Sequence, residues 1–152
     1  KVDGKLTSYL VNKHLGSYFN GRQGQRKIAL TQGFIAGTID NKTVTISREG
    51  SDFSGAILAY CFDAEHLTIW KDVPGVLNAD PKYFAKAKKL PVISYKEAIE
   101  LSYYGASVIH PKTFKSLWNK KIPLFVKSFF LPDDEGTRIY EGVECDLWIL
   151  IV

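Results

Sequence analysis

The sequence predicts an α/β fold with a mostly parallel central sheet. Short apolar runs of strand length alternate along the chain with longer segments of helical pattern, and clusters of Gly, Pro, Asn and Asp separate them. This alternation is typical of strands that are joined by helices and therefore pair in parallel. With 152 residues, of which 45% are apolar and 24% charged, the chain suits one globular domain or part of one.

The N-terminal part predicts a helix, a strand and a hairpin. Scattered apolar residues favour a helix over residues 6–19, and the polar, glycine-containing residues 21–26 follow as a loop. Residues 27–32 form an apolar run that is typical of a buried strand. Residues 40–42 are Asp-Asn-Lys, which has the chemistry of a hairpin turn, and the β-branched run 43–46 predicts the strand after it.

The rest of the chain continues the alternation. A capping box at Ser94 and Glu97 marks the start of a helix that Gly105 can end, and Pro111 suits the first residue of another helix. Turn residues fill the segment after Trp70. Together these signals predict helices at residues 52–62, 95–104 and 111–119, and strands at 67–70 and 123–127.

Composition excludes several classes of function. The net charge of +4 is mild and the basic residues are scattered, so we expect no nucleic-acid partner. No apolar run approaches the ~20 residues that span a bilayer, and no signal-peptide pattern is present, so we expect a cytoplasmic protein. Cys61 lies in an apolar segment and reads as a buried thiol. The chain contains no methionine and begins with Lys1, from which we expect a fragment of a longer protein.

The stretch from Arg48 to Asp52 is the strongest candidate site. It lies between the predicted strand 43–46 and an apolar helix, and a strand, a Gly-containing loop and a helix together direct backbone N–H groups at an anion. Arg48 adds a planar group that suits a carboxylate or phosphate, and Asp52 adds a carboxylate in the first helical turn. A Ser-capped surface helix with solvated charges is the alternative.

Two further segments follow predicted strands, where ligands bind in parallel sheets. They are Gly33-Phe34 and Lys71-Asp72, although a lysine next to an aspartate is also common as a solvated pair. Asp80 and Lys82 belong to a turn-rich loop that could wrap a nucleotide. Walker, dinucleotide-binding and protein-kinase motifs are absent, and the three histidines are dispersed, so we expect no zinc site and a structural role for His110.

Several motifs occur together in a fixed order. They are Gln32-Gly33-Phe34-Ile35-Ala36, Thr45-Ile46-Ser47-Arg48-Glu49-Gly50-Ser51-Asp52-Phe53-Ser54, Trp70-Lys71-Asp72-Val73-Pro74-Gly75-Val76-Leu77-Asn78-Ala79-Asp80-Pro81, Gly105-Ala106-Ser107-Val108-Ile109-His110-Pro111, Ile122-Pro123-Leu124-Phe125-Val126-Lys127-Ser128 and Gly136-Thr137-Arg138-Ile139. Over roughly residues 26–139, this series resembles the C-terminal half of the kinase domain of aspartokinases, which are amino acid kinases. The resemblance implies a layered α/β/α sandwich with a mostly parallel central sheet, incomplete at its N-terminal side.

The resemblance also implies the reaction and the roles of residues. Aspartokinases transfer the γ-phosphate of ATP, with Mg²⁺, to the β-carboxylate of L-aspartate, the first step of lysine, threonine and methionine biosynthesis. Asp52 would be catalytic, as the carboxylate that organises phosphate-binding lysines. Phe34, Thr45, Arg48 and Ser51 would shape the aspartate pocket, and the nucleotide would contact Lys71, Asp72, Leu77, Asp80, Lys82 and Ser107. Residues 1–139 would be the nucleotide-binding part of the kinase domain, and 140–152 a tail or the start of a regulatory region.

The chain departs from the family pattern at important positions. The family's N-terminal motif, with a phosphate-binding lysine, is not found, and Ser107 stands where many relatives have another lysine. On this reading both lysines that Asp52 should organise are absent. We therefore expect the chain alone to be inactive and the full-length parent to be a homo-oligomer. A non-catalytic nucleotide-binding remnant, or a sibling kinase with another acceptor, are the alternatives.

Overall fold

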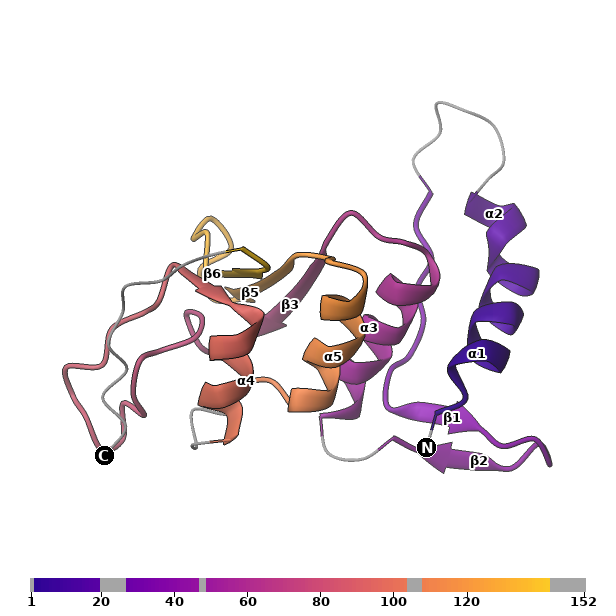
Figure 1. Ribbon diagram of the computed structural model, residues 1–152, viewed down its shortest axis with the longest axis horizontal. Coiled ribbons are helices and arrows are strands. Elements are labelled where there is room, and N and C mark those ends of the chain that lie inside the picture. Colours follow the sequence, from indigo (N-terminus) through magenta and orange to yellow (C-terminus); the bar gives the residue numbers. More distant parts are fainter. Residues whose placement is uncertain (1, 20–26, 47–48, 104–107, 143–152) are drawn as a thin grey trace.

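The computed structural model describes residues 2–19, 27–46, 49–103 and 108–142. A helical run comes first, a two-stranded sheet follows, and a four-stranded sheet with three helices makes up the rest (Figure 1). The elements are α1 (Gly4–Val11), the π-helical turn η1 (Asn12–Gly16), α2 (Ser17–Phe19), β1 (Ile35–Gly37), β2 (Thr43–Thr45), α3 (Gly50–Cys61), β3 (Leu67–Lys71), β4 (Val92–Ser94), α4 (Tyr95–Tyr103), α5 (Pro111–Asn119), β5 (Leu124–Ser128) and β6 (Thr137–Tyr140). None of the described helices has the length and apolar character needed to cross a membrane.

The four-stranded sheet confirms the predicted α/β class. Its strand order is β3-β5-β6-β4, in which β3 pairs with β5 and β4 with β6 in parallel, while β5 and β6 are antiparallel. Lys71 lies opposite Ser128, so the carboxyl ends of β3 and β5 meet at one edge. The sequence did not predict β1, β4 or β6 as strands, although the residues of β6 lie in a recognised motif.

Three helices cover one face of this sheet. Figure 1 shows α3, α5 and α4 following one another beside the strands, and α5 contacts both of the others. Along β5 the side chains alternate between buried and partly exposed, as expected for a strand with one face in the core. The most deeply buried large side chains are Tyr95, Ile93, Ile109, Leu117, Leu124, Ile139 and Val126. Burial of each aliphatic side chain among them stabilises the fold by about 1.5–3 kcal/mol.

Helices α4 and α5 begin where their sequence signals predict. The capping box of α4 is formed: the Ser94 N–H donates to Glu97 Oε2 at 2.7 Å, and the Glu97 N–H donates to Ser94 Oγ at 3.2 Å. His110 caps α5, because its Nδ1 accepts a hydrogen bond from the Lys112 N–H at 3.1 Å, and Pro111 is the first helical residue. The structural role predicted for His110 is therefore confirmed.

The N-terminal helix and the hairpin are also confirmed. Helical residues run from 4 to 19, with a π-helical turn in the middle. Asn41 adopts a left-handed φ of 58° in the turn between the antiparallel strands β1 and β2. These two strands form a separate sheet and do not join the four-stranded one. The predicted loop 21–26, and the predicted helix end at 104–105, lie outside the described residues.

The buried strand predicted at residues 27–32 is wrong. These residues have no strand structure, and Ile28 and Leu30 are 87% and 98% exposed. An apolar run becomes a buried strand only when neighbouring strands take up its backbone hydrogen bonds and a core covers its side chains. The described residues supply neither at this place, so the pattern marks a segment that lacks its packing partner here.

We expect the exposed segment 27–32 to cause self-association, because exposed apolar surfaces on two molecules associate to exclude water. Replacing Ile28 and Leu30 together by lysine should shift the chain toward the monomer in analytical ultracentrifugation. Ile39→Lys is the matched control, since Ile39 is 86% exposed but stands alone in the hairpin turn. If the double variant and the control associate equally, residues 27–32 are not the cause.

We expect Tyr95 to make the fold sensitive to alkaline pH. Its hydroxyl donates to the Ile122 carbonyl oxygen, and burial raises the pKa of Tyr95. In the unfolded chain the phenol ionises at about pH 10. The contribution of Tyr95 to the free energy of unfolding is therefore complete below that pH and falls as the pH rises above it.

Tyr95→Phe should lower the free energy of unfolding by about 1 kcal/mol at neutral pH, because a hydrogen bond is lost. The same variant should lose less stability than the wild type on going to about pH 11. Urea unfolding at both pH values measures this. Tyr103→Phe, at a side chain that is 74% exposed, is the control. Equal alkaline losses in wild type and Tyr95→Phe would contradict the assignment.

Candidate functional site

The site is built around the first turn of α3, which the segment 33–34 crosses closely. A Cβ on Gly33 would lie 2.8 Å from the Ser51 Cα, and one on Gly50 would lie 2.8 Å from the Phe34 ring, so both positions require glycine. The Phe34 N–H donates to Ser54 Oγ at 3.1 Å. The close approach therefore fixes the segment 33–34 against the N-terminus of the helix.

The hairpin brings a third predicted residue to the same place. Thr45 lies opposite Ile35 in the β1–β2 pair, and the Ile46 N–H donates to the Phe34 carbonyl at 2.7 Å. Phe34 itself is 42% exposed and has a left-handed φ of 72°. Phe34 thus lies against the first turn of α3, and Thr45 lies on the strand that pairs with the segment after Phe34. That these residues and Ser51 shape an aspartate pocket stays a prediction. Arg48, the fourth member of that group, lies outside the described residues.

The N-terminus of α3 has the electrostatics of an anion site. The N-cap residue is Glu49, in the left-handed conformation with φ 56°, and its side chain makes no hydrogen bond to the helix. No N-cap side chain therefore occupies the first backbone N–H groups, which carry the positive end of the helix dipole. The alternative of a Ser-capped surface helix is wrong, because the cap is not a serine and Asp52, in the first turn, is mostly buried.

Asp52 forms an ion pair with Lys71. The Lys71 Nζ lies 2.7 Å from Asp52 Oδ2, and the two side chains are only 23% and 12% exposed. Oδ2 is buried, and the Lys71 ammonium group compensates its charge. Because a buried carboxylate needs such a partner, the pair holds the first turn of α3 at the end of β3.

The expected absence concerned the N-terminal lysine of the family and the lysine that Ser107 replaces, and Lys71 is neither of them. Lys71 was predicted only as a nucleotide contact, whereas the structure pairs it with Asp52. Sequence reasoning missed the pairing because α3 and β3 meet only in the folded chain. The available signal was position: Lys71 ends a strand of the parallel pair, at the edge where such folds place their ligands.

Ser128 is a second residue that sequence reasoning missed. It ends β5 directly opposite Lys71, is buried, and accepts a hydrogen bond from the Phe130 N–H at 3.3 Å. The Phe129 N–H donates to the Lys71 carbonyl at 3.0 Å, which extends the pairing of the two strands by one residue. Asp72, immediately beyond, is exposed. The carboxyl edge of the parallel pair therefore brings together Lys71, the exposed Asp72 and the buried Ser128.

The remaining predicted nucleotide residues belong to the long loop after β3. Leu77 forms an antiparallel bridge with Lys89. The Asp80 side chain accepts a hydrogen bond from the Lys82 N–H at 2.8 Å, and its carbonyl accepts one from Phe84 N–H at 2.9 Å, so Asp80 shapes a turn. Lys82 is exposed. That these residues border a nucleotide stays a prediction, and Ser107 lies outside the described residues.

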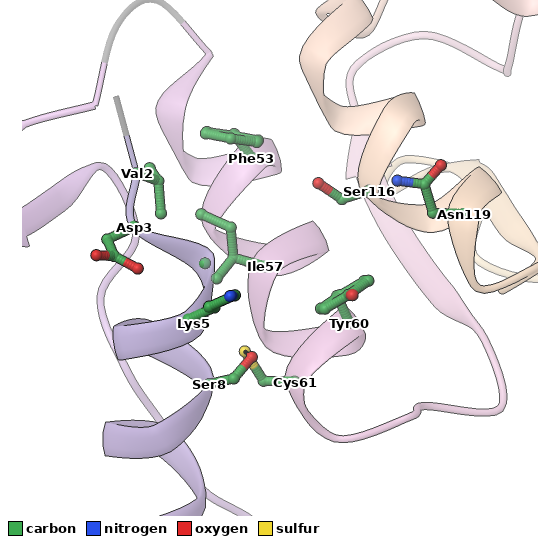
Figure 2. A pocket seen from close by; sticks show the side chains of 11 residues that line it. Val2, Asp3, Lys5, Ser8, Phe53, Ile57, Tyr60, Cys61, Ser116 and Asn119 are labelled. Atoms are coloured by element: carbon green, nitrogen blue, oxygen red, sulfur yellow. Dashed lines mark hydrogen bonds between the residues drawn. The ribbon is translucent and has the colours of Figure 1, made fainter.

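A cavity of about 790 Å³ lies elsewhere, between α1, α3 and α5 (Figure 2). Ser8 on α1 and Cys61 on α3 meet there at 3.3 Å, and Cys61 is a buried free thiol as predicted. None of the predicted site residues lines this cavity, whose walls are Val2, Asp3, Gly4, Lys5, Ser8, Phe53, Ile57, Tyr60, Cys61, Ser116 and Asn119. Among the described residues, no three His, Cys, Asp or Glu side chains cluster in a way that could hold a metal ion.

Comparison with known proteins identifies related sequences. Residues 18–128 match the amino acid kinase family. A bifunctional aspartokinase/homoserine dehydrogenase of Buchnera aphidicola is 47% identical over 117 residues, which is 77% of this chain and 14% of that protein. A chloroplastic bifunctional aspartokinase/homoserine dehydrogenase 1 of Arabidopsis thaliana is 41% identical over 132 residues, which is 87% of this chain and 14% of that protein. The chain thus spans only a small part of these relatives.

Solved structures agree with the sequence relatives. Aspartokinase III of Escherichia coli in complex with aspartate and ADP superimposes with a TM-score of 0.87 and 33% identity, covering 95% of this chain and 31% of that one. The same enzyme in complex with lysine and aspartate gives a TM-score of 0.79. Because these structures contain the fold predicted from the sequence, the α/β class is confirmed.

We expect Asp52→Asn to destabilise the fold, because it leaves the Lys71 charge without its partner in a mostly buried place. The free energy of unfolding should fall by about 1–3 kcal/mol, less than for a fully buried pair, since both side chains retain some exposure. Asp63→Asn is the matched control: Asp63 pairs with Lys120 at 2.5 Å but is 76% exposed, so the loss should stay below about 1 kcal/mol. Equal losses in urea unfolding would show that the Asp52 pair is no more than a surface pair.

Proposed function

The chain belongs to the amino acid kinase family, and we propose that it forms the nucleotide-binding part of an aspartate kinase. The proposed reaction is attack of a β-carboxylate oxygen of L-aspartate on the γ-phosphorus of ATP. The bond from the γ-phosphorus to the bridging oxygen breaks, and the products are ADP and an acyl phosphate. Because little covalent chemistry falls to the protein, its task is to position both substrates and to stabilise negative charge.

The Asp52–Lys71 ion pair is the observation that carries this proposal. It sets a lysine ammonium group beside the N-terminus of α3, so that the charge of Lys71 and the dipole of the helix act in the same place. Both favour a phosphate group. Asp52 keeps Lys71 in position, and an ammonium group carries three donors, so Lys71 can contact Asp52 and a phosphate oxygen together.

The aspartate pocket is proposed next to this pair. Ser51 precedes Asp52 on the helix, and Phe34 and Thr45 lie beside it, so an amino acid held there would reach the phosphate at the N-terminus of α3. Arg48 would bind one of its carboxylates through two parallel hydrogen bonds. The solved E. coli aspartokinase III with aspartate and ADP supports this choice of substrates.

Mg²⁺ is proposed as a metal that arrives with the ATP phosphates. Magnesium in such sites usually keeps most of its waters and takes only one or two protein carboxylates, so the lack of a metal-binding cluster among the described residues fits it. When bound, it would neutralise part of the charge on the transferring phosphate. The exposed carboxylate of Asp72, which follows the last residue of β3, is the group that we propose would face it.

The isolated chain is proposed to bind nucleotide without turnover. Two phosphate-binding lysines of the family are absent: the N-terminal one, and the one replaced by Ser107. Losing one donor to a transition state costs about 2.7–4 kcal/mol, so two cost roughly 5–8 kcal/mol if the losses add. An activation barrier higher by that amount leaves the chain with almost no catalysis. The alternative, a non-catalytic nucleotide-binding module, makes the same prediction for the isolated chain. The two hypotheses differ only in whether the full-length protein is a catalyst.

We expect Lys71→Met to weaken ADP binding by about 10–100-fold, the value of a hydrogen bond to a charged group. Isothermal titration of the chain with ADP, with and without Mg²⁺, measures this. Lys121→Met is the matched control, because Lys121 is 78% exposed and pairs only weakly with Glu141, at 3.6 Å.

A coupled assay for ADP release on the same preparations should detect no aspartate-dependent turnover. Aspartate-dependent ADP release by the wild-type chain would overturn the proposed inactivity. A Lys71→Met variant that is folded and binds ADP as tightly as the control would overturn the proposed role of Lys71.

A further inference from the structure

We propose that Thr137 is a positioning residue for the nucleotide: its buried hydroxyl holds both ends of the loop formed by residues 76–90. The inference rests on the proposed function, because this loop carries Leu77, Asp80 and Lys82. Thr137 itself lies on β6 and belongs to none of the predicted site residues. It would act through the loop and would not touch the ligand.

The two ends of the loop form a narrow neck. The Leu90 N–H donates to the Val76 carbonyl at 2.9 Å, and the Asn78 N–H donates to the Lys88 carbonyl at 3.0 Å. The Lys88 N–H in turn donates to the Asn78 side-chain oxygen at 2.8 Å. These hydrogen bonds pair the two ends of the loop in a short antiparallel ladder. Residues 79–87 form the loop between the paired ends.

Thr137 ties the base of this neck to the sheet. Its Oγ1 accepts a hydrogen bond from the Val76 N–H at 2.8 Å and donates one to the Leu90 carbonyl at 2.7 Å. The residue is fully buried. A single hydroxyl therefore satisfies the backbone groups that the neck turns outward, one from each side, and acts as the next rung of the ladder.

Gly75 leaves room for this hydroxyl because it has no Cβ. Its φ is +144°, and a Cβ at this position would lie 2.5 Å from Thr137 Oγ1, closer than any side chain allows. Glycine is thus needed here for two reasons, the backbone angle and the approach of the threonine. The backbone next to the loop can therefore approach the Thr137 hydroxyl only with a glycine at position 75.

A second anchor lies outside the neck. Lys89 forms an ion pair with Asp134 at 2.5 Å, and Asp134 also accepts a hydrogen bond from the Gly136 N–H at 2.7 Å. The hydrogen bonds from Lys89 and Gly136 lower the pKa of Asp134. The contribution of this anchor is therefore complete above the ordinary aspartate pKa and is lost only as the pH falls through the lowered value. At neutral pH both anchors are in place.

The consequence is a loop of defined position. It leaves the sheet next to Lys71, the partner of Asp52, and returns at β4, so the neck sets how residues 79–87 lie relative to the carboxyl edge of β3. Without the hydroxyl, the Val76 N–H and the Leu90 carbonyl would be buried without partners. Buried groups of that kind open toward water.

The test compares Thr137→Val, which keeps the shape and removes the hydroxyl, with Thr137→Ser, which keeps the hydroxyl. Thr113→Val is the matched control: Thr113 is also fully buried, but its hydroxyl has no hydrogen-bond partner among the described residues. Amide hydrogen exchange is measured on the full chain without nucleotide, and ADP affinity by titration.

In Thr137→Val we expect exchange about tenfold faster or more, confined to residues 76–90, and ADP affinity lower by about tenfold. Thr137→Ser should restore both, and Thr113→Val should change neither.

Unchanged exchange in Thr137→Val overturns the anchoring of the loop, whatever happens to ADP. Faster exchange with unchanged ADP affinity, where the wild type binds ADP, overturns the positioning role alone. A wild-type chain that binds no ADP overturns the proposed nucleotide site, while the exchange data still decide whether Thr137 holds the loop.

Discussion

The Asp52–Lys71 ion pair is the interaction on which the geometry of the site depends. A charge that is mostly removed from water is tolerated only with a partner, so each side chain fixes the element that carries the other. The first turn of α3 is thereby held at the carboxyl end of β3. The glycine contacts that place Phe34 against α3, and the loop that leaves β3 after Lys71, both take their position from that junction. One pair of charges thus aligns the parts that we propose as the binding sites of the two substrates.

Local signals in the sequence were sufficient to predict the elements whose ends are determined by nearby residues. The capping box predicted the start of α4, and Pro111 predicted α5, because the groups that satisfy the first N–H donors of a helix lie within a few residues. Short apolar runs predicted β3 and β5. The elements that failed depend on distant neighbours. β1, β4 and β6 are only three or four residues long, and residues 27–32 carry a strand pattern whose neighbours are not among the described residues.

The candidate site divides in the same way. Motif resemblance singled out Asp52, Lys71, Phe34, Thr45 and Ser51. The structure pairs Asp52 with Lys71 and packs Phe34 against the first turn of α3. The ion pair between two of them, and the place of Ser128 opposite Lys71, required the folded sheet, because no spacing in the sequence reports which strand ends meet. Thr137 is a similar case: a threonine in a strand is unremarkable until the backbone groups that its hydroxyl serves are known.

The strand order has a consequence for how the chain is made. β6 follows every other described element in the sequence, yet it occupies an inner position of the sheet, between β5 and β4. During synthesis on the ribosome, β4 cannot join the β3–β5 pair until residues 137–140 have emerged. Until then the edges of β5 and β4 stay open, and open edges are where nascent chains pair with the wrong partner. The described part of the chain is therefore open to misassembly in the interval before β6 emerges.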